Sequence, residues 1–138
     1  MLELNDSLSF LINKCNQKAL YVANNYLEDL DLTPPQALAL HALLIKDGIN
    51  QLTLGEKIQK DKTTTGNILM KLEETGFINR EIDPEDRRSS IIYLTAKAKE
   101  QQYELKERLF KINNTLSLNL TDIELQLLMS LLKKIWNE

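Results

Sequence analysis

The side chains of this chain that could do chemistry are concentrated in two short segments between residues 61 and 88. The first segment reads Asp-Lys-Thr-Thr-Thr-Gly-Asn from Asp61 to Asn67, at the predicted start of a helix. The second reads Asp-Pro-Glu-Asp-Arg-Arg from Asp83 to Arg88, between two short apolar runs. Hydroxyl and backbone N–H groups at a helix start suit phosphate oxygens, whereas amide and guanidinium groups suit base edges and grooves. The two segments therefore indicate chemistry directed at a nucleic acid.

The elements that must position these segments follow from apolar spacing and from helix-capping signals. The pattern predicts one domain over residues 1–138, mainly α-helical with a small β-hairpin. Thr33, Asp61, Thr95 and Thr121 are predicted helix caps, and Gly76 ends the helix that Asp61 begins. The predicted helices cover roughly residues 6–30, 33–46, a short stretch beginning near 50 or 53, 61–75, 95–118 and 121–136, and the hairpin strands cover 77–82 and 90–94.

The order of these elements is typical of a winged helix-turn-helix. A short helix is followed by a tight turn, a helix with a polar N-terminal face, and a hairpin. In the short helix, Thr53 and Glu56 have the spacing of a capping box, and Gly55 would let another helix approach closely. We expect residues of about 33–99 to form a DNA-binding lobe, because this stretch holds both segments.

The flanking helices predict a second copy of the chain as a partner. The last helix carries a wide apolar stripe from Leu120 to Trp136. Exposed on a monomer, a stripe of this width would promote aggregation. We therefore expect residues 1–32 and 100–138 to act as dimerisation helices, which makes homodimerisation a prediction of the sequence.

Composition and charge limit the other classes of function. The 138 residues are 43% hydrophobic and 27% charged. No apolar run approaches the roughly 20 residues of a membrane span, and the N-terminus lacks a signal-peptide pattern, so we expect a cytoplasmic protein with no membrane partner. The net charge of −3 argues mildly against nucleic acid. However, residues 53–99 carry nine Lys/Arg against eight Asp/Glu, so the negative charge belongs to the rest of the chain.

The sequence predicts no catalytic activity, no cofactor and no metal site. His41 is the only histidine and Cys15 the only cysteine, which leaves no nucleophile–base pair and no metal-ligand set. Cys15 lies on the apolar stripe of the first helix, so we expect a buried, inert thiol rather than an oxidant sensor. Tyr21, Tyr26 and His41 are candidate contacts for a small-molecule effector, with a half-buried structural histidine as the alternative for His41.

Several motifs resemble those of the MarR (multiple antibiotic resistance) family of transcriptional regulators. They occur in the family's order at Leu32–Gln36, Asp61–Thr64, Leu72–Arg80, Asp83–Ser89 and Ile92–Thr95. The resemblance implies a homodimer, joined through its terminal helices, that binds a pseudo-palindromic operator in double-stranded DNA. Each subunit would place one helix in a major groove and its wing over the adjacent minor groove. Family members commonly act as repressors that a small, often aromatic, ligand releases from DNA.

The chain departs from the family's usual residues at three positions near the predicted interface. It has Gly66 where Ser or Thr is common, Asn67 where Arg is often found, and Lys60 where an apolar residue is usual. The operator sequence therefore cannot be copied from that of a relative.

We assign the DNA contacts to the outward face of the helix over residues 61–75 and to the wing. Hydroxyl and lysine groups would fix the register on phosphates, and Asn67 could pair with adenine. Arg88 is the predicted minor-groove finger, held by Asp86 as the family's Asp-x-Arg pattern suggests. Arg80 and Arg87 would meet phosphates. The predicted DNA-binding residues are Lys62, Thr63, Thr64, Asn67, Lys71, Arg80, Arg87 and Arg88.

The sequence leaves two alternatives open. The same side chains occur on ordinary solvated helices and on surface loops whose ion pairs contribute at most about 1 kcal/mol. A winged helix can also bind a protein partner without DNA affinity, in which case binding would depend only slightly on salt.

Overall fold

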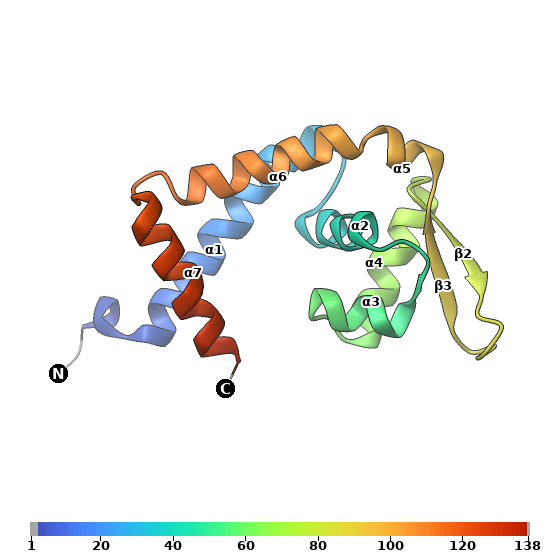
Figure 1. Cartoon of the computed structure of the whole chain (residues 1–138), viewed down its shortest axis with the longest axis horizontal. Coiled ribbons are helices and arrows are strands. Elements are labelled where there is room, and N and C mark those ends of the chain that lie inside the picture. The colour runs from blue at the N-terminus through green and yellow to red at the C-terminus, as the bar shows by residue number, and fades with distance from the viewer. Residues whose placement is uncertain (1–2, 138) are drawn as a thin grey trace.

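The computed structural model describes residues 3–137 and shows a helical protein with one small sheet, which confirms the predicted fold class (Figure 1). The elements in chain order are the 3₁₀ helix η1 (Leu4–Asp6), α1 (Leu8–Leu27), the 3₁₀ helix η2 (Glu28–Leu30), α2 (Pro34–Ile45), β1 (Ile49–Asn50), α3 (Gln51–Ile58), α4 (Lys62–Glu74), β2 (Ile78–Ile82), β3 (Ser90–Leu94), α5 (Ala96–Glu100), α6 (Gln102–Leu116) and α7 (Asp122–Trp136).

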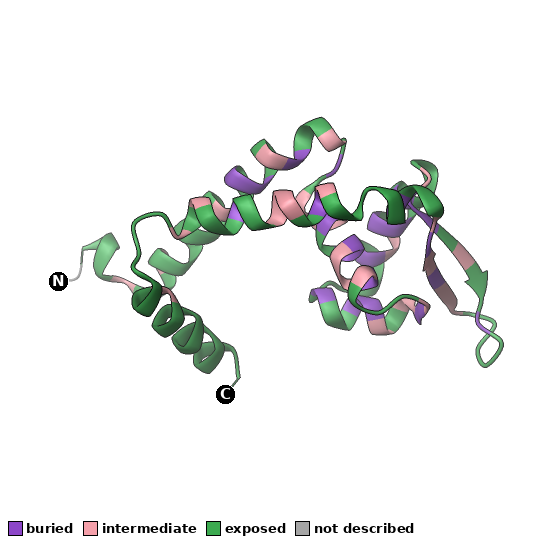
Figure 2. Ribbon diagram, turned by 45° about the horizontal axis from the view of Figure 1, so that its top comes forward, coloured by how far each residue is buried: buried purple, intermediate pink, exposed green. Residues whose placement is uncertain are grey.

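The molecule has two parts, which we call the lobe and the arm (Figure 1). The lobe comprises α2 to α5 with the sheet, and the arm comprises α1, α6 and α7. Buried residues are concentrated in the lobe and in the adjoining part of the arm, whereas the far end of the arm is exposed (Figure 2). The largest fully buried side chains are Leu27, Leu43, Leu54, Leu69, Leu72, Ile78, Ile92 and Thr65.

Short polar side chains begin most of the helices. Thr33 and Gln36 form a capping box at α2, and Asp61, Thr95 and Thr121 each accept the N–H of the third residue of their helix, as predicted. Of the two predicted starts of the short helix, the one near Asn50 is confirmed and the one at Thr53 is not. Asn50 accepts the Thr53 N–H at 2.8 Å, so α3 begins at Gln51 and the Thr53–Glu56 capping box does not form.

The predicted two-stranded hairpin is part of a three-stranded antiparallel sheet with the order β1-β3-β2. Ile49 of β1 pairs with Ile92, which on its other side pairs with Arg80 of β2. The sequence did not indicate β1, because two residues are too few for an alternating pattern. Asn50 also caps α3, so this strand leads directly into the helix-turn-helix.

The long helix predicted over residues 95–118 is interrupted at Gln101, which lies between α5 and α6. Gln101 has φ −92° and ψ 2°, outside the helical range, although it still bonds to Lys97 and Leu105 through its N–H and its carbonyl. The change of direction keeps Ala98 in the lobe's core and lets α6 lie along α1 (Figure 1). The interruption contains neither Gly nor Pro, so no local signal marks it.

The last helix of the arm contributes nothing to the core. α7 contains no buried residue, although its sequence is rich in large apolar side chains. The exposed apolar residues of α7 are Ile123, Leu127, Leu128, Met129, Leu131, Leu132, Ile135 and Trp136. Within the part of the chain that the structure describes, no helix is long and apolar enough to cross a membrane.

Candidate nucleic-acid interface

The helix α4 presents one apolar face to the lobe and one polar face to solvent. Thr65, Ile68, Leu69 and Leu72 are buried at three- and four-residue steps, which fixes the helix on the lobe. The residues that the sequence assigned to DNA on this helix all lie on the opposite, exposed face: Lys62, Thr63, Thr64, Asn67 and Lys71. They remain predicted contacts, and the fold presents them together.

The first turn of α4 is fixed by its cap. Asp61 Oδ1 accepts the backbone N–H of Thr64 at 2.7 Å. This hydrogen bond lowers the pKa of the Asp61 carboxyl below its ordinary value, so the group is ionised at neutral pH. The cap leaves the hydroxyls of Thr63 and Thr64 exposed at the helix start.

The turn between α3 and α4 is closely packed, as Gly55 predicted. A Cβ atom on Gly55 would lie 3.0 Å from the Thr65 hydroxyl and 3.2 Å from the Lys60 carbonyl oxygen. The Thr65 hydroxyl donates a hydrogen bond to that carbonyl at 3.4 Å. Gly55 is therefore required by the close approach of the two helices.

The wing loop between β2 and β3 is stabilised by hydrogen bonds between its own residues. Asp83 is buried and its carboxylate accepts the Glu85 N–H at 2.9 Å. The Asp83 carbonyl accepts the Asp86 N–H, and the Asp86 carbonyl accepts the Ser89 N–H. The sequence did not indicate this role of Asp83, although an Asx turn before Pro is a known turn signal.

The pair predicted to form the wing finger, Asp86 and Arg88, is in contact. The Asp86 carboxylate accepts the Arg88 backbone N–H at 3.0 Å, and the guanidinium Nε lies 3.7 Å from the same oxygen. The Arg88 side chain is 94% exposed, so this ion pair contributes little to stability. Asp86 shapes the loop backbone more than it holds the guanidinium, and Arg87 is likewise exposed.

Arg80 differs from the other predicted basic contacts because it lies within the lobe. Its side chain is only 23% exposed; Nη1 donates to Gln51 Oε1 at 3.3 Å, and Nε lies 3.6 Å from the Glu73 carboxylate. The residue thereby connects β2 to the start of α3 and to α4. The sequence did not indicate this role of Gln51, because its partner Arg80 is 29 residues away.

A groove runs between the helix-turn-helix and the wing. It is lined by Gln51, Leu52, Gly55, Glu56, Lys60, Asp61, Lys62, Thr65, Asp86, Arg88, Ser89 and Ser90. The start of α4 thus forms one wall and the arginine-bearing loop the other. The groove combines three basic with three acidic side chains, so its field is mixed rather than uniformly positive.

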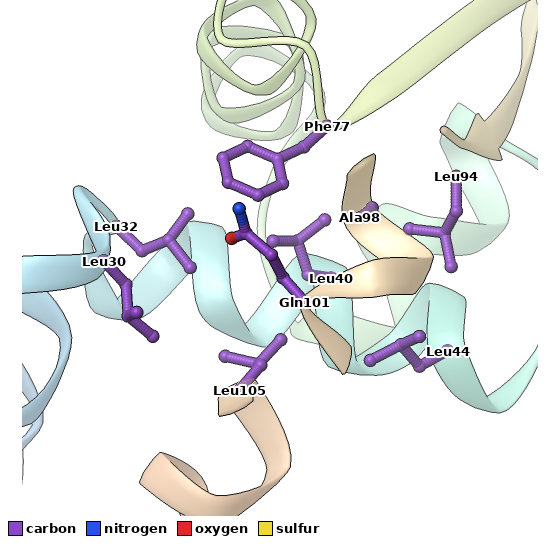
Figure 3. A pocket seen from close by; sticks show the side chains of 9 residues that line it. All are labelled: Leu30, Leu32, Leu40, Leu44, Phe77, Leu94, Ala98, Gln101 and Leu105. Atoms are coloured by element: carbon purple, nitrogen blue, oxygen red, sulfur yellow. The ribbon is translucent and has the colours of Figure 1, made fainter. Parts of the chain in front are cut away.

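A second, smaller pocket lies where the arm meets the lobe (Figure 3). It encloses about 10 Å³ of free space, the minimum for a single water molecule. Its lining residues are Leu30, Leu32, Leu40, Leu44, Phe77, Leu94, Ala98, Gln101 and Leu105. Gln101, at the interruption between α5 and α6, supplies the only amide side chain among them (Figure 3).

The residues predicted for an effector site do not line this pocket. Tyr21 is largely exposed, Tyr26 shares a hydrogen bond with the Thr115 hydroxyl at 2.9 Å, and His41 is half-buried. The prediction that Cys15 is buried is wrong for this chain, since its thiol is exposed. Among residues 3–137, no three or more His, Cys, Asp or Glu side chains are grouped as they would be around a metal ion.

Comparison with known proteins agrees with this architecture. The MarR family model matches residues 32–90. The transcriptional regulator HosA of Escherichia coli O111:H- is 39% identical over 66 residues, 48% of this chain and 49% of HosA. The HTH-type transcriptional regulator SarZ of Staphylococcus saprophyticus is 31% identical over 97 residues, 70% of this chain and 66% of SarZ.

A solved structure extends the likeness to nearly the whole chain. The crystal structure of a mutant MarR from E. coli complexed with operator DNA has a TM-score of 0.86 at 28% identity and covers 93% of this chain and 92% of that one. The chain spans about half the length of HosA and about two thirds of SarZ. The named relatives are transcriptional regulators rather than enzymes. This chain belongs to the MarR family.

Proposed function

We propose that this protein is a sequence-specific, double-stranded DNA-binding transcriptional regulator that acts as a homodimer. The observation that carries the proposal is the groove between α4 and the wing, because Lys62 at the start of α4 and Arg88 of the wing line its two sides. The similarity to a MarR protein complexed with operator DNA supports the same assignment.

The exposed face of α4 would enter a major groove. Thr63, Thr64 and the N–H groups of the first turn suit phosphate oxygens and would fix the register. Asn67 follows on the same exposed face, and its amide matches the N6 and N7 atoms of adenine. Lys62 and Lys71 would bind phosphates on either side.

The wing would place Arg88 in the adjacent minor groove. A guanidinium is favoured there, because the negative potential is strongest where the minor groove is narrow. Arg87, on the same loop, would bind a phosphate. The local arrangement of these bases, rather than the net charge of −3, governs attraction to DNA.

The arm would join two copies of the chain. The apolar side chains of α7 are exposed in the single chain, and a second copy would cover them. A symmetric dimer would present two copies of α4 to two half-sites of a pseudo-palindrome. Bound at a promoter in the cytoplasm, the dimer would act as a repressor.

Release from DNA would follow from movement at the junction of arm and lobe. A small-molecule effector would enter there and would need to enlarge the pocket in Figure 3, which has room for one water molecule. An effector can act only if it binds one arrangement of arm and lobe better than the other. Such a shift would change the distance between the two α4 helices.

Footprinting and fluorescence anisotropy on the DNA upstream of the protein's own coding sequence test the proposal. We expect protection of two half-sites about one helical turn apart. If Arg80 joins the four basic side chains named above, five per subunit contact the DNA, and the slope of log affinity against log salt would reach its upper limit of around −9. No footprint together with a flat salt dependence would favour the alternative, a winged-helix module that binds protein.

A further inference from the structure

The arm and the lobe are joined by two chain segments that lie side by side (Figure 1). The chain leaves the arm through residues 27–33, where η2 ends at Asp31 in a left-handed conformation with φ 60°. It returns through α5, Gln101 and the start of α6. The orientation of the lobe relative to the arm depends on how these two segments are held together.

One guanidinium of α6 links this arm helix to the last turn of α1 and to the first of the two segments. Arg108 of α6 donates from Nη1 to the Tyr26 carbonyl oxygen at 2.7 Å and binds both carboxylate oxygens of Asp29, with Nη2 at 2.9 Å from Oδ2. Its Nε donates to the Glu104 carboxylate at 2.8 Å. The Arg108 side chain is only 18% exposed, whereas its partner Asp29 is 62% exposed, so the carboxylate lies at the solvent-facing side of the contact.

The geometry of this contact is rigid. Two parallel N–H···O bonds to one carboxylate fix the plane of a guanidinium, which a single lysine ammonium could not do. Asp29 and Arg108 are 79 residues apart in sequence. Among the salt bridges within residues 3–137, this is the only one that connects the N-terminal to the C-terminal part of the chain.

The position of this contact gives it leverage over α4. The end of α4 contacts α5, but its first turn lies on the side of the lobe away from α6, so a small rotation at the junction moves the start of α4 over a larger distance (Figure 1). In a dimer joined through the arms, the same rotation changes the spacing of the two recognition helices. A dimer binds operators whose two half-sites have a fixed spacing. The junction can therefore set which half-site spacing the dimer accepts.

We propose that Arg108, through Asp29 and the Tyr26 carbonyl, is a positioning residue that sets the half-site spacing which the dimer accepts. The proposal rests on the function proposed above. It assigns to Arg108 a role in DNA recognition although Arg108 lies in α6, outside the lobe, and does not line the groove.

Affinity for operators of different spacing tests this role. Fluorescence anisotropy would compare the footprinted operator with versions that have one base pair inserted or deleted between the half-sites. We expect the wild type to prefer its own spacing by about tenfold or more. Arg108→Met and Asp29→Asn should reduce that preference to about threefold or less, and Arg108→Lys should not restore it.

A matched control distinguishes positioning from general loss of an ion pair. Lys111→Met removes the neighbouring Lys111–Glu107 pair, which lies entirely within α6, and should keep the wild-type preference. Circular dichroism would confirm that each variant is folded at the assay temperature. A uniform loss of affinity at all spacings, or an unchanged preference, in Arg108→Met would overturn the proposal.

A second measurement does not need DNA. In a Cys15→Ser background, a spin label at Glu74→Cys on the exposed end of α4 reports the distance between the two subunits' helices. Arg108→Met should broaden the distribution of this distance, whereas Lys111→Met should not. If Arg108→Met broadens the distance distribution but the wild type does not bind DNA, the proposed function is wrong, and Arg108 still sets the spacing of the two helices. A narrow, unchanged distribution, or a monomer, would refute the role of Arg108 itself.

Discussion

The Thr65 hydroxyl of α4 lies 3.0 Å from the point where a side chain on Gly55 of α3 would begin. The same hydroxyl donates to the Lys60 carbonyl, so the contact between the helices also closes the turn that joins them. A methyl group on Gly55 would therefore have to displace the Thr65 side chain or the backbone of the turn.

We predict that Gly55→Ala lowers the free energy of unfolding by about 1–3 kcal/mol, because the added methyl must displace backbone in the turn. Thermal denaturation followed by circular dichroism measures the loss. Gly66→Ala is the control: its Cβ would meet only the Gln51 side-chain amide at 3.4 Å, and alanine is favoured over glycine in a helix by about 1 kcal/mol. Equal stability of the two variants would contradict the tight contact.

Arg88→Ala should weaken operator binding without lowering the melting temperature, because the side chain is almost fully exposed. The dimer would lose two cationic contacts, so the salt slope should become shallower by about 2. Lys106→Ala, which removes the same charge from the exposed surface of α6, should leave both affinity and slope unchanged. An Arg88→Ala protein with wild-type affinity would reject the wing-finger role.

Arg80→Met should act mainly on stability. The substitution keeps the apolar stem but leaves Gln51 and the Glu73 carboxylate without their partner, at a cost of about 1 kcal/mol. Arg87→Met on the exposed loop should instead leave stability unchanged and reduce the salt slope. Chemical denaturation measures the stability of both variants, and fluorescence anisotropy measures their salt slopes. A larger change of salt slope for Arg80→Met than for Arg87→Met would show that Arg80 binds phosphate.

The apolar face of α7 should control the oligomeric state. Leu128→Glu together with Leu131→Glu should convert a dimer into a monomer, since both side chains are exposed in the single chain. Ser130→Glu, which adds charge at a polar position of the same helix, should leave the dimer intact. Light scattering at micromolar concentration distinguishes the two results, and a monomeric wild type would remove the basis for a symmetric operator.

The stability supplied by Asp29 should depend on pH. A hydrogen bond from the Arg108 guanidinium lowers the pKa of the Asp29 carboxyl below its ordinary value of 3.8. A carboxyl whose pKa is lower in the folded state stabilises the fold above the unfolded-state pKa, and this stabilisation is lost as the pH falls through the folded-state pKa. The melting temperatures of wild type and Asp29→Asn should therefore differ at pH 7, begin to converge below about pH 4, and coincide only when the pH is below the lowered pKa of Asp29. A constant difference would show that the carboxylate charge is not involved.

The sequence predicted those features of the fold that neighbouring residues determine. Thr33, Asp61 and Thr121 cap helices within three residues of themselves, so their roles are visible in the sequence. The outward face of α4 followed from the periodicity of Ile68, Leu69 and Leu72 in the same way.

Features that depend on distant partners were not predicted. The strand β1 exists because Ile49 pairs with Ile92, and Arg80 is held inside the lobe because Gln51 lies opposite it. The exposure of Cys15 has a related cause. An apolar stripe predicts burial, but a single chain need not contain the surface that covers it.

The self-contained hydrogen bonding of the wing loop bears on the thermodynamics of association. Hydrogen bonds of Asp83 and Asp86 fix the conformation of the loop backbone in the protein alone. Binding to DNA therefore need not order a flexible loop. The entropy lost on meeting a duplex would then come chiefly from the rotamers of the arginine side chains. A preorganised loop of this kind would leave more of the contact free energy available for affinity.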